Sequence, residues 1–216
     1  MSKVSYTIAV FLLSSLTSVY AAVVPVGVQE DISLTTVTDT WGWDLQYRGD
    51  YNLNLSIDTM FGGHGDLIML GAIKDGSDTI ELLAATTWSD FWTYTAKNTT
   101  NESNGAEWYN NGGSLGFAGL GDSINQSSAD TSSVNANLRL SWHTESNYDQ
   151  IAQSIQYGWR AGETTGLNSS TNWDRIVFTA NSADLIATPI PAAAFMFAPA
   201  LLGFMGLRRK AKNSVA

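Results

Sequence analysis

The sequence predicts an all-β protein: an antiparallel β-sandwich of jelly-roll-like form, with an N-terminal signal helix and a short C-terminal transmembrane helix. Three observations support this prediction. Apolar and polar residues alternate with a period of two along most of the chain. Turn-forming Gly and Asn residues separate the alternating runs. Helical periodicity is nearly absent outside the two apolar ends, and the number of strands and long loops favours a jelly roll.

The first 22 residues have the composition of a secretory signal peptide. Lys3 supplies the positive charge, and residues 8–16 form a short apolar run. Ala21 and Ala22 provide small residues at a cleavage site. This order of features predicts that the rest of the chain is exported.

Residues 188–212 form a second apolar segment. Pro189 and Pro191 precede an apolar run over residues 192–207. These 16 residues would span roughly 24 Å as a helix, which is short of the ~30 Å hydrocarbon core. The positive-inside rule keeps the basic end cytoplasmic, so the preceding chain is expected outside. The run is closed by basic residues, namely Arg208, Arg209, Lys210 and Lys212.

This arrangement resembles the PEP-CTERM sorting domain of exported Gram-negative proteins. In that family a membrane protease of the exosortase type recognises the Pro-containing motif, the short apolar helix and the Arg-rich end together. Ile190 stands here where a Glu often lies between the prolines. The resemblance implies passage through the inner membrane to the cell surface or extracellular matrix, with the exosortase-type protease as a partner. A simple C-terminal membrane anchor is the alternative.

Residues 23–187 are expected to form one domain with its own core. The chain has no cysteine, so disulfides cannot stabilise it. All 20 Asp and Glu residues fall in this segment against six Lys and Arg, which gives it a net charge of −14. Such a surface repels nucleic acid and suits cations or neutral or cationic polymers. Solubility alone is an equally good explanation.

Two hairpins are expected in the first half of this domain. Residues 43–48 and 51–57 alternate on either side of a predicted turn at Gly49-Asp50. Residues 67–73 are continuously apolar and are followed by a strand at 79–87, so this pair should be central in its sheet.

The second half is predicted to begin with long loops over residues 88–133. Asn104-Gly105 and residues 111–113 favour turns, and one or two short strands such as 114–117 are expected between them. Alternation predicts three later strands, around residues 138–142, 155–159 and 175–179.

The sequence offers little catalytic chemistry. His64 and Asp66 lie in a Gly-rich loop, but one His with one carboxylate does not make a transition-metal site. His143 follows Ser141 by two residues without a nucleophile-elbow motif. A non-catalytic protein is therefore expected. A secreted hydrolase acting on matrix polysaccharide is the alternative, because carboxylates distant in sequence can pair in the fold.

Calcium is the one ion that the sequence suggests, and no other cofactor is expected. Asp75 and Asp78 flank a Gly-Ser turn and offer oxygen ligands, to which Asp31 or Asp58 could add. The same Asp-Gly pair is also what a hairpin turn requires for backbone reasons alone.

The eight tryptophans are the richest feature of the chain. Trp43, Trp142 and Trp159 alternate in predicted strands and are expected in the core. Aromatic rings in polar loops can stack on sugar rings, so extracellular polysaccharide is a predicted partner, unless these rings pack under the loops. A purely structural, self-assembling protein is a further possibility. The candidate glycan-binding residues are Trp92, Trp108, Tyr109 and Trp173.

Overall fold

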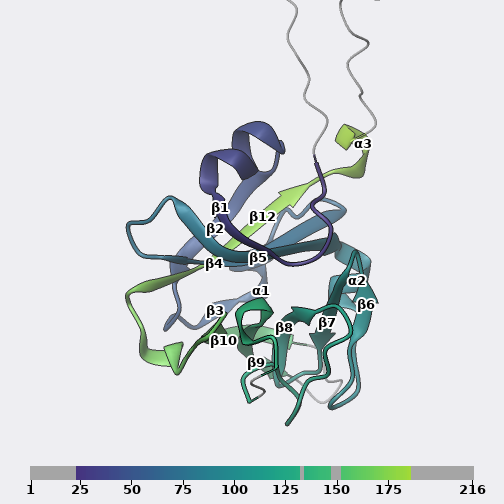
Figure 1. Cartoon of the computed structure of the whole chain (residues 1–216), viewed down its shortest axis with the longest axis vertical. Helices are drawn as coiled ribbons and strands as arrows, with labels where there is room; N and C mark the ends of the chain where they lie inside the picture. The colour runs from purple at the N-terminus through teal and green to yellow at the C-terminus, as the bar shows by residue number, and fades with distance from the viewer. Residues whose placement is uncertain (1–22, 132–133, 147–151, 186–216) are drawn as a thin grey trace, which may run out of the picture. The chain divides into compact units, whose positions relative to one another are not determined.

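The computed structural model describes residues 23–131, 134–146 and 152–185 (Figure 1). The signal peptide predicted at residues 1–22 and the sorting segment predicted at 188–212 lie outside these residues. Among the described residues, no helix has the length and apolar character needed to cross a membrane.

Two antiparallel sheets make up the described part of the chain (Figure 1). The first sheet has the strand order β1 (Gln29–Ser33), β5 (Thr79–Thr87), β4 (Leu67–Lys74), β12 (Trp173–Ala180) and β2 (Asp44–Asp50). The second has the order β11 (Thr164–Thr165), β10 (Ala152–Ala161), β9 (Leu140–Ser146), β8 (Ser114–Gly119), β7 (Ala106–Asn110) and β6 (Asn101–Ser103), and β3 (Leu55–Ser56) also pairs with β10.

Short helical segments lie between these strands and after the last one. They are the π-helical turn η1 (Thr36–Thr40), the helices α1 (Ile57–Phe61), α2 (Trp88–Trp92) and α3 (Ser182–Leu185), and the 3₁₀ turns η2 (Ala136–Leu138) and η3 (Leu167–Ser169).

The main hydrophobic core lies between the two sheets. It contains Ile68 and Val177 from the first sheet and Leu140 and Trp142 from the second, all fully buried. The described part of the chain is thus a β-sandwich. The expected core positions of Trp43 and Trp142 are confirmed, since their side chains are 1% and 0% exposed.

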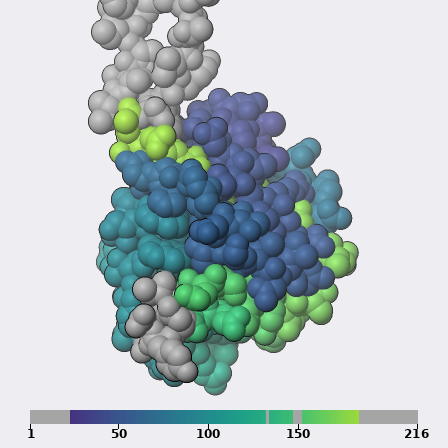
Figure 2. All heavy atoms as spheres, turned by 180° about the vertical axis from the view of Figure 1, so that it is seen from behind, coloured from purple at the N-terminus to yellow at the C-terminus, as the bar shows by residue number. Residues whose placement is uncertain are grey.

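A second cluster covers the other face of the first sheet. Val37 of η1 and Trp43 pack there against Met69 and Phe178. Figure 1 shows η1 on the side of this sheet away from the second sheet. In the view from behind, the purple N-terminal segment packs beside the yellow-green end of β12 (Figure 2). Because β4 is buried on both faces, its sequence is continuously apolar, and the predicted central hairpin of β4 and β5 is confirmed.

The first predicted hairpin is wrong. β2 pairs with β12 instead of residues 51–57, and Gly49 lies within β2. After Asp50 the chain crosses from one sheet to the other at Tyr51, which is fully buried. The N–H of Tyr51 donates to the carbonyl of Trp173 at 2.8 Å, and its carbonyl accepts from Gly158 at 2.7 Å. The residues beyond it form β3 and α1, because bonds to two sheets hold the chain in this crossing.

The long loops predicted over residues 88–133 are also wrong in part, because this region holds α2, β6, β7 and β8. Asn104 and Gly105 have φ angles of 47° and 76° and form the two-residue turn of a β6–β7 hairpin. Nδ2 of Asn104 donates to the carbonyls of Pro25 and Ala85, which fixes this turn against the first sheet.

The second sheet is not of jelly-roll type. Strands β6 to β11 neighbour one another in chain order as a meander, whereas a jelly roll would alternate strands between two sheets. The physical reason is that short turns join most of these strands, so sequence neighbours pair directly.

Candidate functional site

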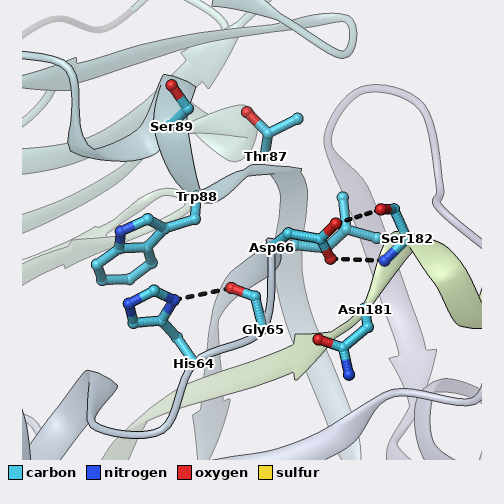
Figure 3. Close-up of a pocket in the computed structure, with 9 residues that line it drawn as sticks. His64, Gly65, Asp66, Thr87, Trp88, Ser89, Asn181 and Ser182 are labelled. Atoms are coloured by element: carbon cyan, nitrogen blue, oxygen red, sulfur yellow. Dashed lines mark hydrogen bonds between the residues drawn. The ribbon is translucent and has the colours of Figure 1, made fainter.

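A column of stacked aromatic rings lies where α2 meets the loop after α1. The ring of His64 stacks on Trp88 with centroids 3.5 Å apart and planes 8° from parallel (Figure 3). Trp88 is in turn parallel to Trp92 at 5.3 Å and 10°. We call His64, Trp88 and Trp92 the aromatic ledge. His64 is exposed and both indoles are half-buried, so the column runs from the core to the surface.

The local sequence explains this geometry. Thr87 caps α2, since its Oγ1 accepts from the N–H of Asp90 at 3.0 Å. Trp88 and Trp92 are four residues apart and therefore lie on the same side of the helix. Behind them, Phe61 and Phe91 contact both indoles with ring centroids 5.5–6.3 Å apart, which holds the ledge to the core.

Glycine lets the loop carrying His64 approach the end of β12. A Cβ on Gly65 would lie 2.7 Å from the carbonyl carbon of Ala180 and closer still to its oxygen. Nδ1 of His64 donates to the carbonyl of Gly65 at 2.8 Å, which orients the imidazole over Trp88. Glycine is therefore required at position 65 for this close packing.

A cleft of about 650 Å³ opens beside His64 and Trp88, within the range typical of small-molecule sites. Polar residues line its other walls (Figure 3): Asp66, Thr87, Ser89, Asn181 and Ser182. The carboxylate of Asp66 accepts hydrogen bonds from the hydroxyl and the N–H of Ser182, and these bonds lower the pKa of Asp66. The cleft thus combines flat aromatic surface with a fixed carboxylate, hydroxyls and an amide.

The four predicted glycan contacts do not lie together. Trp92 belongs to the aromatic ledge. Trp108 and Tyr109 lie on β7 and are each 1% exposed, so the prediction that they are surface platforms is wrong. They are buried because the Asn104-Gly105 turn starts a strand, whose residues pack on both faces of the sheet.

Trp173 begins β12 and is 9% exposed, with Nζ of Lys74 5.4 Å from its ring centroid. Its prediction as an open platform is wrong as well, because its ring is covered by Lys74 and packs edge-on against Tyr51. It does form part of the wall of a second cleft of about 300 Å³, whose carboxylates come from Glu30, Asp31, Glu81 and Glu163.

Asp75 and Asp78 are exposed on the turn between β4 and β5, as the sequence predicts. Two carbonyl oxygens of this turn already accept hydrogen bonds from Arg48, whose Nη1 donates to the carbonyl of Ser77 at 3.2 Å and whose Nη2 donates to that of Lys74 at 3.4 Å. In the described part of the chain, no group of three or more His, Cys, Asp or Glu residues is arranged to hold a metal ion. Calcium binding at this turn, with or without Asp31 or Asp58, stays a prediction.

Ser141 and His143 do not form a catalytic pair with a nearby acid in the way a serine hydrolase requires. Ser141 is fully buried, whereas His143 is half-buried and faces Asp130, with Nε2 and Oδ2 3.9 Å apart. Burial lowers the pKa of His143 despite the attraction of Asp130. Burial likewise raises the pKa of Asp130, with His143 opposing it.

Sequence reasoning missed the ledge because it considered His64 only as a metal ligand and did not predict α2. Two features indicate this helix: a Thr before the aromatic run, and tryptophans spaced by four. Comparison of the chain with family models, with curated proteins and with solved structures gives no match.

Proposed function

We propose that this protein is an exported, non-catalytic β-sandwich protein that associates with polysaccharide of the bacterial extracellular matrix. The observation that carries this proposal is the aromatic ledge beside a cleft that has polar side chains in its walls. Sugar rings have apolar CH faces and hydroxyl edges, so a flat ring next to carboxylate, amide and hydroxyl groups matches both. The sugar face stacks on the open end of the ledge, and its hydroxyls bond the groups around Asp66.

The targeting part of the proposal is supported by the order of residues at the two ends of the chain. Residues 1–22 direct export, and residues 188–212 act as a PEP-CTERM-like sorting segment that an exosortase-type protease processes at the inner membrane. Pro189, Pro191 and the basic residues 208–210 are the recognition features. The folded body is then delivered to the cell surface or matrix of a Gram-negative bacterium.

Binding of the purified body, residues 23–187, to exopolysaccharide from the source organism tests the ledge. Affinity electrophoresis in gels containing the polymer measures the retardation. Trp88→Ala removes the central ring and is expected to lower the affinity at least tenfold, which corresponds to about 1.4 kcal/mol. Tyr94→Ala is the matched control, because Tyr94 is 46% exposed close to α2 and is outside the stacked column. Equal retardation of the two variants would refute the ledge as the site.

One observation favours the alternative, a hydrolase acting on the same polymer. The cleft beside Trp173 brings together carboxylates from β1, β5 and the segment before β11, the kind of groups that act as acid and base in glycoside hydrolysis. This function would be established if the wild-type body shortens the polymer and the Glu163→Gln variant does not. Unchanged polymer length during saturable binding would exclude it for that polymer.

A further inference from the structure

A second group of half-buried aromatic residues lies on the outer face of the second sheet. Gly158 faces the core, where it contacts Tyr51, so its neighbours Tyr157 and Trp159 point outward. The ring of His143 on the paired strand lies 5.1 Å from Tyr157 and 5.9 Å from Trp159, centroid to centroid. The prediction from sequence that Trp159 is a core residue is therefore wrong, because its side chain is half-buried on the outside.

A cavity of about 350 Å³ adjoins this aromatic group, with His143 in its wall. The other walls come from Lys97 in the loop after α2, from the β7–β8 turn and the start of β8, and from residues 126–130 of the segment between β8 and β9. They present groups of every hydrogen-bonding type: the hydroxyl of Ser128, the amide of Gln126, the carboxylate of Asp130 and the ammonium of Lys97. Aromatic surface and mixed polar groups again meet in one place.

The rim of this cavity is held in place by buried contacts. The hydroxyl of Tyr109 accepts from the N–H of Ala129 at 3.2 Å, and Nη1 of Arg160 donates to the carbonyl of Ala129 at 2.9 Å. The N–H of Ser127 donates to Oδ1 of Asn98 at 2.7 Å. Tyr109 and Arg160 are 1% and 3% exposed, so the segment is anchored to the core of the sheet. A pre-organised rim of this kind lowers the entropic cost of binding.

We propose that His143, Tyr157, Trp159 and the adjoining cavity form a second polysaccharide-binding site, and that one folded body thereby bridges two polymer segments. The ligand class is a neutral sugar polymer, because a carboxylate and an ammonium group face the same cavity and neither charge dominates. The aromatic ledge is built on α2 and the loop after α1, whereas this site is built on β9 and β10, and the two share no residue. The inference rests on the proposed function, since both sites take the same polymer.

A bridging protein differs from a singly binding one in what it does to polymer-coated surfaces. Two sites of modest affinity cross-link chains when both are occupied, and loss of either site abolishes cross-linking. Matrix cohesion then becomes the role of the body after sorting.

The test follows each site separately through the tryptophan indole N–H resonances of ¹⁵N-labelled residues 23–187. The probe is a set of short oligosaccharide fragments of the source organism's exopolysaccharide. We expect the Trp159 resonance to shift on titration, and to shift equally in Trp88→Ala. We expect Trp159→Ala or Tyr157→Ala to leave the shifts of the ledge unchanged. Beads coated with the polymer should aggregate with the wild type and with Tyr94→Ala, but not with Trp88→Ala, Trp159→Ala or Tyr157→Ala.

The outcomes separate the two proposals. Shifts at Trp88 and Trp92 without a shift at Trp159 would overturn the second site and leave the proposed function standing. A shift at Trp159 alone would support the second site and overturn both the ledge and the bridging role. Absence of any shift, together with absence of bead aggregation, would overturn the proposed function and the second site together.

Discussion

Replacement of Gly158 by alanine is expected to destabilise the domain, because the ring of Tyr51 packs directly against this residue. A Cβ at position 158 would lie 2.7 Å from Cγ of Tyr51 and closer still to its Cδ1 and Cε1. The ring cannot move aside easily. It is fully buried and packs edge-on against Trp173 at 6.4 Å, and its hydroxyl accepts from Nε1 of Trp142 at 3.3 Å.

The size of the effect follows from two opposing terms. Overpacking of a filled core costs ~1–3 kcal/mol. Loss of glycine flexibility in the unfolded chain offsets this by ~0.4–1 kcal/mol. The expected net loss is therefore about 1–2 kcal/mol, or a decrease in Tm of roughly 2–8 °C for a domain of this size.

Urea unfolding of residues 23–187, followed by tryptophan fluorescence, measures this change. Gly113→Ala is the control, because a Cβ there meets only Oδ1 of Asn111 at 3.9 Å and the residue is exposed with an ordinary φ. Its stability should match the wild type within about 0.5 kcal/mol. Indistinguishable unfolding midpoints for Gly158→Ala and Gly113→Ala would refute the packing of Tyr51 against β10.

Three further outcomes follow. Asn104→Ala removes two hydrogen bonds and places an alanine in a left-handed backbone conformation, so the free energy of unfolding in urea should decrease by about 2–3 kcal/mol. A decrease below about 0.5 kcal/mol would contradict this role of Asn104 in the turn. Burial lowers the pKa of His143 in the folded protein, whereas its pKa in the unfolded chain is near 6.5, so the free energy of unfolding decreases as the pH falls below that value. His143→Gln should therefore lose less stability than the wild type between pH 8 and pH 5. An equal loss in the two proteins would refute this. The hydrogen bonds from Ser182 lower the pKa of Asp66, so their contribution to the free energy of unfolding is lost on acidification below about pH 4. This acid-induced loss of stability should be smaller in Ser182→Ala. An unchanged loss in that variant would count against the contact.

The sequence predicted those strands whose pattern reflects burial alone. The apolar run of β4 is continuous because both faces of its sheet are covered, and β9, β10 and β12 also lie where alternation indicates. Pairing partners were harder to predict. The alternation continues through Gly49-Asp50 into residues 51–57, yet the chain changes sheets at Tyr51, because long-range bonds to Trp173 and Gly158 outweigh the local turn preference.

The candidate site was predictable only in its chemistry. The excess of tryptophan indicated aromatic surface, and Trp92 does lie on the ledge. The burial of Trp108 and Tyr109 depends on a hairpin whose turn was recognised but whose strands were not. The stacking of His64 on Trp88 joins residues 24 positions apart in sequence, and no local pattern encodes such a contact.

The most direct test of the central claim is binding of residues 23–187 to the source organism's exopolysaccharide, with and without calcium, while the polymer length is followed. We expect saturable binding that Trp88→Ala weakens at least tenfold, with unchanged polymer length. Loss of binding on chelation would show that the interaction depends on calcium. Asp75 and Asp78 would then be the first ligands to test by substitution. Polymer shortening would make the protein a hydrolase, and absence of binding under both conditions would contradict the polysaccharide-binding function.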